Sequence, residues 1–299
     1  MIVSNNQHSI QAVTHAGIFH ADEVMATAIL GRCGITQVSR VLAVPEGLDE
    51  SVIVFDIGGG KYDHHQKAGK PLRTNGTPYA ACGLIWRDFG RRACAGILGQ
   101  VSPSLLETVW EAVDRTMIRP IDLIDNGEIE KGKSSLSALI SDFNPCWNSV
   151  EDADASFLRA VELADTVLCN RVRVCAATAE AEELVKDALR GADGPVLVLD
   201  RFAPWKTALE SAGTAGERIL FVVYPAIRGG FNCQCVPRDG NPFAQKCPLP
   251  LLWRGLRQEE LRRITGVQTA LFCHPGGFLC GAETEEDAIK LATIAMEVE

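Results

Sequence analysis

The sequence has no run of about 18 or more apolar residues, which excludes a hydrophobic transmembrane helix and a membrane partner. Its first residues contain no basic segment followed by an apolar stretch, so we expect no secretory signal. Aromatic residues make up only 6% of the chain, and 29 basic residues face 38 acidic ones, for a net charge of −9. This balance argues against a protein that coats nucleic acid by bulk charge, but it leaves room for a local basic groove.

The 11 cysteines include no C-x-x-C pair, which disfavours a structural zinc site among Cys233, Cys235 and Cys247. Together with the absent signal, they predict reduced, mostly buried thiols in a cytoplasmic protein. The sequence also lacks a repeat of roughly 20–50 residues and the G-x-S-x-G motif of many serine hydrolases. Acyl transfer at such a serine is therefore disfavoured.

What the sequence does contain is enough apolar residues, 46%, for one large domain or two ordinary ones. In its first half, strands alternate with helices, which predicts an α/β fold with a mainly parallel sheet flanked by helices. The predicted strands are 10–14, 38–44 and 51–57, and the predicted helices are 22–33, 78–99 and 103–125.

A long helix over 152–190 should connect this half to a second domain, because the stretch contains no Pro or Gly and Gly191–Pro195 follows it. We therefore expect a catalytic domain at 1–190 and a smaller α/β substrate domain at 195–299. The second domain should contain strands at 196–199, 218–224, 231–236 and 269–273, and helices near 255–264 and 283–297. Residues 201–280 carry more basic than acidic side chains, whereas the first 200 residues are net acidic.

Histidine and aspartate residues gather in four segments at or near strand ends: 14–23, 54–59, 62–66 and 121–127. His15 follows the first predicted strand, and Asp56 lies at the end of another. Because ligands of open α/β sheets bind beyond the carboxyl ends of the strands, we expect these two side chains to converge. Any one segment has a plainer explanation as a cap or a turn, but their joint occurrence favours a metal site.

Mixed imidazole and carboxylate ligands suit Mn²⁺, Fe²⁺ or Zn²⁺. Two such ions, about 3.5–4 Å apart, can share a carboxylate and activate a bridging water for attack on phosphorus. This chemistry fits phosphoester hydrolysis, because the metal ions neutralise the charge that develops on oxygen.

The order of these segments resembles the DHH phosphoesterase superfamily. The closer resemblance is to its branch of metal-dependent protein hydrolases, which includes the melanocyte proliferating gene product. The matching motifs are Thr14-His15-x-Gly17-x-Phe19-His20-x-Asp22-Glu23, Val54-Phe55-Asp56-Ile57-Gly58-Gly59, Tyr62-Asp63-His64-His65-Gln66 and Asp122-x-x-Asp125-Asn126-Gly127. Two later stretches also match: 248–257, with Pro248-Leu249-Pro250 and Trp253-Arg254-Gly255-Leu256-Arg257, and 274–278, His274-Pro275-Gly276-Gly277-Phe278.

The resemblance implies two divalent metal ions, with Mn²⁺ the first expectation. His15, His20 and Asp56 would hold one ion. The second would be held by Asp22, Asp56, His64 and Asp125, with Asp56 bridging. His65 would contact the reacting phosphate, and Asp63 would orient a histidine. His20 replaces the aspartate usual in the first motif of the wider superfamily, which makes the site less negative and brings Zn²⁺ or Fe²⁺ into consideration.

The C-terminal half would then bind the substrate. Its candidate residues are Lys206, Arg228, Arg254 and Arg257, which could clamp phosphates, and His274, Gly276 and Gly277, whose backbone could approach a phosphate closely. The plainer alternatives are solvated surface charges for the cations and a hairpin turn for the glycines.

The expected function is a metal-dependent phosphodiesterase, a 3′→5′ exonuclease on single-stranded RNA or short oligonucleotides. The first alternative is a small-molecule phosphohydrolase acting on pyrophosphate, a nucleotide or a cyclic dinucleotide. The second is a metal-binding protein without turnover. A peptide hydrolase has the least support, and the sequence predicts no oligomeric state.

Overall fold

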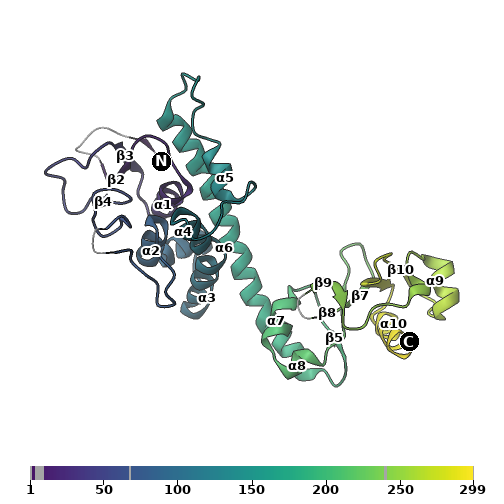
Figure 1. The fold of residues 1–299 in the computed structure, drawn as a ribbon. Helices are drawn as coiled ribbons and strands as arrows, with labels where there is room; N and C mark the ends of the chain where they lie inside the picture. Colours follow the sequence, from purple (N-terminus) through teal and green to yellow (C-terminus); the bar gives the residue numbers. More distant parts are fainter. Residues whose placement is uncertain (1, 4–9, 67–68, 239–240, 299) are drawn as a thin grey trace. The chain divides into compact units, whose positions relative to one another are not determined.

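The computed structural model describes residues 2–3, 10–66, 69–238 and 241–298 (Figure 1). The chain divides into two compact units, which we call unit 1 (residues 1–177) and unit 2 (residues 178–299). Both combine helices and strands, in agreement with the expected α/β class. The division falls inside helix α6 (Ala153–Gly191), which spans nearly the whole stretch predicted to be one helix. Within the described part of the chain, no helix is both long and apolar enough to cross a membrane.

Unit 1 is built on a parallel sheet with the strand order β1-β3-β2-β4. Its strands are β1 (Ile2–Val3), β2 (Ala12–His15), β3 (Gln37–Val41) and β4 (Ile53–Val54). Since β2 is a central strand and β4 its neighbour, the segments that follow them leave the sheet side by side. This arrangement positions the first two histidine and aspartate segments.

Strand β4 is shorter and less buried than the sequence indicates. The apolar run 51–57 predicts a strand covered on both faces, but β4 contains only two half-buried residues. It lies at the edge of the sheet, so one side has no strand to pair with. The chain leaves the strand at Phe55, which pairs with Tyr62 in a single parallel bridge.

The helices of unit 1 enclose one core. They are α1 (Ala21–Arg32), α2 (Ala81–Leu98), α3 (Pro103–Val113), α4 (Arg119–Asp125), α5 (Leu136–Ser141) and the first part of α6. Every residue of α1 from 21 to 30 is buried, including the carboxylates of Asp22 and Glu23, because the helix is enclosed by the rest of unit 1.

The helix predicted over 103–125 is interrupted by a π-helical turn at Asp114–Ile118. The N–H of Arg119 bonds to the carbonyl of Asp114, five residues earlier. Pro120 follows and has no N–H to donate. Turns of this kind occur often near functional sites, and α4 directly afterwards contains Asp122 and Asp125.

Unit 2 contains a mixed sheet with the strand order β10-β11-β7-β6-β5, in which only the β5–β6 pair is parallel. The strands are β5 (Val196–Val198), β6 (Phe221–Pro225), β7 (Phe231–Cys235), β10 (Ala270–Cys273) and β11 (Leu279–Ala282). The helices are α7 (Trp205–Ser211), α8 (Thr214–Glu217), α9 (Gln258–Thr265) and α10 (Glu285–Glu297). A short ribbon of β8 (Pro237–Arg238) and β9 (Asn241–Gln245) completes the unit with a single turn at Leu251–Trp253. All 11 cysteines are free thiols.

Candidate metal centre

The sheet brings His15 and Asp56 together although they lie far apart in the sequence. His15 ends β2, and Asp56 follows β4. The Phe55 N–H donates to the Val13 carbonyl at 3.0 Å, which carries the pairing of the two strands past the end of β4. As a result, His15 Nε2 lies 3.3 Å from Asp56 Oδ2.

Asp56 occupies an unusual backbone conformation. Its φ angle is +56°, in the left-handed region that non-glycine residues rarely adopt. The turn continues through Gly58, where an added Cβ would lie 2.8 Å from Val44 Cγ2. Strained backbone of this kind persists where surrounding contacts fix it, and it often accompanies function.

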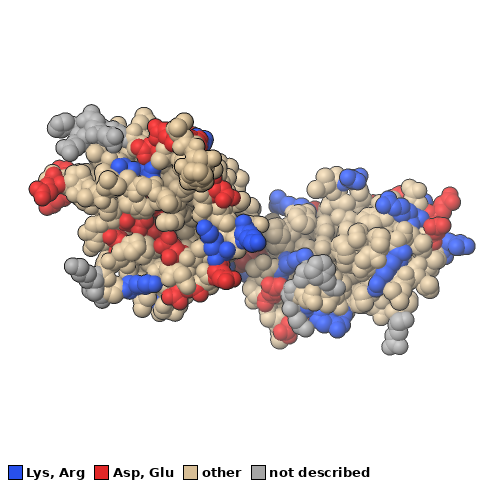
Figure 2. Space-filling model, turned by 45° about the horizontal axis from the view of Figure 1, so that its top comes forward, with Lys and Arg blue, Asp and Glu red and all other residues tan. Residues whose placement is uncertain are grey.

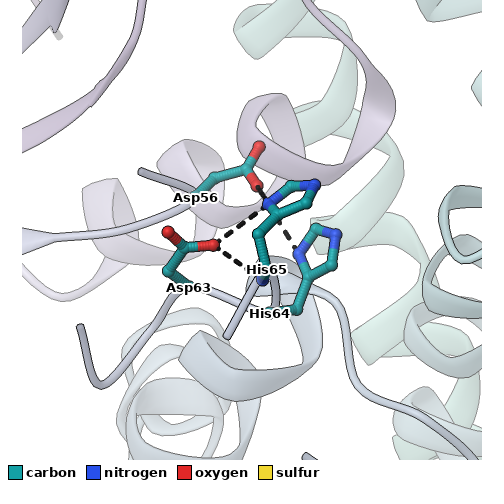
Figure 3. Close-up of side chains that lie close together, drawn as sticks. All are labelled: Asp56, Asp63, His64 and His65. Atoms are coloured by element: carbon teal, nitrogen blue, oxygen red, sulfur yellow. Dashed lines mark hydrogen bonds and ion pairs between the residues drawn. The ribbon is translucent and has the colours of Figure 1, made fainter. Parts of the chain in front are cut away.

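The Asp63-His64-His65 segment folds back over Asp56 (Figure 3). Asp63 orients His65, because its Oδ1 accepts the His65 backbone N–H at 2.9 Å and contacts the ring Nδ1 at 3.0 Å. His64 Nδ1 lies 3.5 Å and His65 Nδ1 3.7 Å from Asp56 Oδ1. His64 is buried, whereas the His65 side chain is 68% exposed, so His65 is the member of the pair that a bound molecule can reach.

Asp22 serves two purposes at once. Its carboxylate accepts the backbone N–H groups of Ala81 at 2.9 Å and Cys82 at 2.6 Å, and thereby caps α2. The same carboxylate lies 3.8 Å from His64 Nδ1. On the other side of that ring, His64 Nε2 lies 3.2 Å from Asp125 Oδ2. His64 therefore stands between two carboxylates.

His15 and His20 form a second group with Glu23. Glu23 is fully buried, its Oε1 lies 3.0 Å from His15 Nε2, and it accepts the His20 backbone N–H at 2.9 Å. Sequence reasoning included Glu23 in the first motif but did not select it as a functional residue. The residue before the helix is His20 rather than Ser, Thr, Asp or Asn, so the sequence contains no capping-box signature that could have identified Glu23.

Asn144 fixes the loop that carries His20. Its side-chain Oδ1 accepts the Phe19 N–H at 2.9 Å, and its Nδ2 donates to the Phe19 carbonyl at 2.8 Å. Arg40 holds the same loop by donating to the Gly17 carbonyl at 2.7 Å. Neither residue belongs to a motif that the sequence analysis identified, because only the fold brings them to this loop.

The close charges shift several pKa values. Hydrogen bonds to Asp56 and Glu23 raise the pKa of His15 to about 10. Burial, with the nearby charges of Asp56 and Asp125, raises the pKa of Asp22 well above its usual value. Burial lowers the pKa of His64, but the hydrogen bond to Asp125 and the charge of Asp56 outweigh it and leave that pKa raised. These closely spaced carboxylates therefore repel one another unless protons or cations lie between them.

Unpartnered buried atoms support cation binding at this place. Asp56 Oδ1, His64 Nδ1 and Glu23 Oε2 are buried without a hydrogen-bond partner among the described residues, which is costly unless another group binds them. The described part of the chain contains four groups whose potential ligand atoms lie within 4.8 Å of one another. Three of the groups contain the residues described above: Asp56 with Asp63, His64 and His65; His15 with His20 and Glu23; and Asp22 with His64 and Asp125. The residues present therefore fit metal ions.

A cavity of about 380 Å³ opens onto this cluster. His15, His20, Asp22, Asp56, His65 and Asp125 line one part of it, and the rest is lined by Ala21, Ile121, Ile124, Lys131, Ser137 and Ser141. Its volume falls in the usual range for small-ligand sites. Sequence analysis did not identify Lys131, Ser137 and Ser141, because an isolated Lys or Ser carries no recognisable pattern.

Beneath the cavity lies the fourth group, Asp22 with Cys82 and Asp122. Asp122 Oδ1 accepts the Gly83 N–H at 3.0 Å, and Oδ2 accepts a hydrogen bond from Arg73 Nη2 at 2.6 Å. Burial raises the pKa of Asp122 to about 7, although Arg73 opposes the shift. This group is occupied by protein donors, so we assign it a structural role.

In unit 2, the predicted substrate residues fall in different places. Lys206 lies exposed on α7, and Arg228 is exposed in the turn between β6 and β7. Arg257 is exposed just before α9, whereas Arg254 is half-buried and donates through Nε and Nη2 to the Leu249 carbonyl at 3.1 and 3.0 Å. Lys and Arg side chains are scattered over the face of unit 2 that Figure 2 displays, while acidic side chains gather in the middle of unit 1.

His274, Gly276 and Gly277 form the hairpin between β10 and β11, which was the plainer alternative. The Gly276 N–H donates to His274 Nδ1 at 3.0 Å, and the Gly277 N–H donates to the His274 carbonyl at 2.9 Å. Both N–H groups are therefore engaged within the turn, which differs from the expectation that they point to a phosphate. Gly277 has a φ of +66°, and any Cβ there would overlap the guanidinium of Arg254. The structure thus brings Arg254 and Gly277 together.

Fold and site together define a mixed α/β protein with a cluster of imidazole and carboxylate groups suited to metal ions. Residues 11–296 match the sequence model of a protein family that is named after the MYG1 exonuclease and described as an uncharacterised protein family (UPF0160). The chain belongs to this family. The chain is 32% identical to the human MYG1 exonuclease, over 93% of this chain and 84% of the human protein. It is 31% identical to the rat MYG1 exonuclease, over 93% and 82% of the two chains. It is also 31% identical to a MYG1 protein of Schizosaccharomyces pombe, over 96% and 98%.

Proposed function

We propose that this protein is a metal-dependent phosphodiesterase that acts as a 3′→5′ exonuclease on single-stranded RNA or short oligonucleotides. The observation that carries the proposal is the convergence of His15, Asp56 and His64 beside one cavity, with buried atoms on Asp56 and His64 that have no partner among the described residues. The exonuclease names of the mammalian relatives support nucleic acid as the substrate. The motif order supports a site of the DHH phosphoesterase type, and the free thiols support a reducing compartment such as the cytoplasm.

Two divalent ions, with Mn²⁺ the first choice, are proposed to bind here. His15, His20 and Asp56 would hold one, with Glu23 available as a further ligand, and Asp22, Asp56, His64 and Asp125 the other. When bound, the ions supply an activated water and neutralise charge on the phosphate. Asp56 would contact both ions, which explains why one strained backbone position lies at the centre of the cluster.

Side chains that are not proposed as metal ligands would contact the substrate. His65 is exposed at the cavity and fixed by Asp63, so it would donate a hydrogen bond to a phosphate oxygen and stabilise its charge. In unit 2, we propose that Lys206, Arg228, Arg254 and Arg257 contribute to binding phosphates, and that the hairpin of His274, Gly276 and Gly277 contributes through groups other than its two glycine N–H groups, which the turn engages. Binding through phosphates should weaken as salt rises.

The test is hydrolysis by metal-stripped protein that has been re-supplied with Mn²⁺, beside the variant Asp56→Asn. The substrates are 5′-labelled single-stranded RNA, single-stranded DNA, a dinucleotide and pyrophosphate. We expect a ladder of products from RNA that shortens from the 3′ end and is absent in Asp56→Asn. The control is Glu107→Gln, an exposed carboxylate on α3 that pairs with Arg91 outside the cavity, and it should match the wild type.

The other outcomes separate the alternatives. Cleavage of only the dinucleotide or pyrophosphate would favour the small-molecule phosphohydrolase. Full activity in Asp56→Asn would overturn the two-metal mechanism. Binding of metal without cleavage of any of the four substrates would favour a protein that has kept the site without turnover.

A further inference from the structure

The cavity of unit 1 has a wall that the metal ligands do not explain. Beside the carboxylates and imidazoles, the same cavity is lined by Lys131, from the loop after α4, and by Ser137 and Ser141 from α5. Lys131 is the one Lys or Arg among the described residues that line this cavity. We call these three residues the lysine–serine wall.

Lys131 is exposed, and its ammonium group is hydrogen-bonded without being neutralised. Its Nζ donates to Ser141 Oγ at 3.0 Å, and Ser141 Oγ donates in turn to the Ser137 carbonyl at 2.8 Å. No carboxylate of the described residues comes within ion-pair distance of Lys131, although three aspartates line the same cavity. An ammonium group with donors to spare therefore faces the space where a ligand would sit.

Ser137 adds an independent observation. Its side chain is only 6% exposed, and its Oγ is buried with no hydrogen-bond partner among the described residues, yet it lines the cavity. A buried hydroxyl without a partner is costly. A ligand oxygen in the cavity would supply the missing partner, and the Ser137 hydroxyl could donate to it.

The chemistry of the wall selects the ligand. Lysine is a common phosphate binder that acts as a point charge, and a serine hydroxyl completes such sites as a neutral donor. The proposed metal ligands His15, His20, Asp22, Asp56 and Asp125 line the same cavity, so one bound phosphate could meet both sets of residues. We infer that the lysine–serine wall binds the substrate phosphate, with Lys131 and Ser137 contacting oxygens that face away from the metal ions. This inference rests on the proposed function and assigns part of phosphate recognition to unit 1 itself.

The test measures binding without turnover. Adenosine 5′-monophosphate is titrated into the Mn²⁺-loaded full-length protein by calorimetry, with adenosine as the ligand that lacks the phosphate. We expect Lys131→Gln to weaken binding of the monophosphate about tenfold or more, because a charged hydrogen bond is lost. Binding of Mn²⁺ and of adenosine should be unchanged. The matched control is Lys133→Gln, an exposed lysine two residues away that does not line the cavity.

Ser137→Ala distinguishes recognition from a structural role. Removing a hydroxyl that has no partner in the protein should leave the thermal midpoint unchanged or raise it, while binding of the monophosphate weakens severalfold. In hydrolysis assays, both variants should raise KM more than they lower kcat.

The outcomes keep the two proposals apart. If the wild type cleaves RNA but Lys131→Gln binds the monophosphate as tightly as Lys133→Gln, the wall has no such role and the proposed function stands. If no substrate is cleaved while Lys131→Gln loses monophosphate binding, the wall is supported and the exonuclease proposal fails. Unchanged phosphate binding with altered Mn²⁺ affinity would make Lys131 a counter-charge for the carboxylates. A wild type that does not bind the monophosphate would also overturn the inference.

Discussion

Asp56 belongs to the candidate metal site and has a backbone conformation that few residues adopt. Its left-handed φ of +56° costs most side chains about 1–2 kcal/mol, whereas Asp and Asn tolerate it through local hydrogen bonding. Sequence identified this residue from its place after an apolar strand. The conformation was not predictable, because it depends on the turn that returns the chain to Tyr62.

Substitutions of Asp56 should therefore separate chemistry from stability. We expect Asp56→Ala to be about 1 kcal/mol less stable than Asp56→Asn in the metal-free state, because the left-handed backbone conformation is less favourable for alanine than for asparagine. Urea unfolding of both variants with EDTA present measures the difference. Equal midpoints and slopes would show that the turn relaxes when the aspartate is replaced.

Asn144 offers a second test at the scale of one residue. Asn144→Ala removes both hydrogen bonds to the Phe19 backbone. The N–H and the carbonyl of Phe19, a fully buried residue, then lose these partners. We expect a loss of about 2 kcal/mol of stability and weaker Mn²⁺ binding, because the loop that carries His20 is no longer fixed.

The measurement for Asn144→Ala is Mn²⁺ titration by calorimetry together with urea unfolding. Asn148→Ala, an exposed asparagine close by, is the control and should resemble the wild type. Asn144→Asp keeps the acceptor for the Phe19 N–H but loses the donor, so it should fall between the two. Unchanged metal affinity in Asn144→Ala would show that His20 does not depend on the clamp.

Among the elements, α2 begins on two buried carboxylates. Its first N–H groups are accepted by Asp22 and Asp122, which come from α1 and α4. Gly83 makes this possible, because a Cβ there would overlap the Asp122 carboxylate and lie 2.8 Å from Tyr79 Cδ1.

Gly83→Ala should therefore destabilise the protein, by about 2–3 kcal/mol, because the Asp122 carboxylate is buried and paired with Arg73 and cannot withdraw. Thermal unfolding followed by circular dichroism measures it. Gly191→Ala at the end of α6 has open space around its Cβ, so it should be neutral or slightly stabilising. A neutral Gly83→Ala would mean that α4 shifts easily.

Element-level prediction succeeded where local signals act alone. The long helix was recognisable because 152–190 contains no breaker, and α1 was recognisable from its apolar spacing and the glycine that follows it. The π-turn at Asp114–Ile118, the short helix α5 and the edge position of β4 were missed. Each depends on tertiary contacts or strand order, which no local pattern in the sequence reveals. For the same reason, the site could be predicted through its motif residues but not through Asn144, Arg40, Lys131 or Ser137.

At the scale of the whole molecule, every proposed metal ligand belongs to unit 1. Metal binding should stabilise that unit, since ions that bind only the folded state shift the unfolding equilibrium by about 2.7 kcal/mol at a hundredfold excess over the Kd. Hydrogen–deuterium exchange with and without Mn²⁺ tests this.

In the exchange experiment, we expect added protection in residues 13–24, 54–66 and 121–127 and little change in the sheet of unit 2. Asp56→Asn should show much less added protection. Protection centred on β7 and β11, near the buried thiols of Cys233, Cys235 and Cys280, would place the tightest metal site in unit 2 instead.

The double duty of Asp22 bears on how such a protein would change over evolutionary time. If the proposed hydrolase activity were lost in a lineage, selection would still keep Asp22, because α2 starts on its carboxylate. His65 has no comparable structural role among the described residues, since its side chain is largely exposed and it caps no described helix. Neutral drift would erase His65 long before Asp22. The presence of His65 in a relative is therefore the more informative sign that the site is still in use, and the presence of Asp22 alone says only that the helix is still needed.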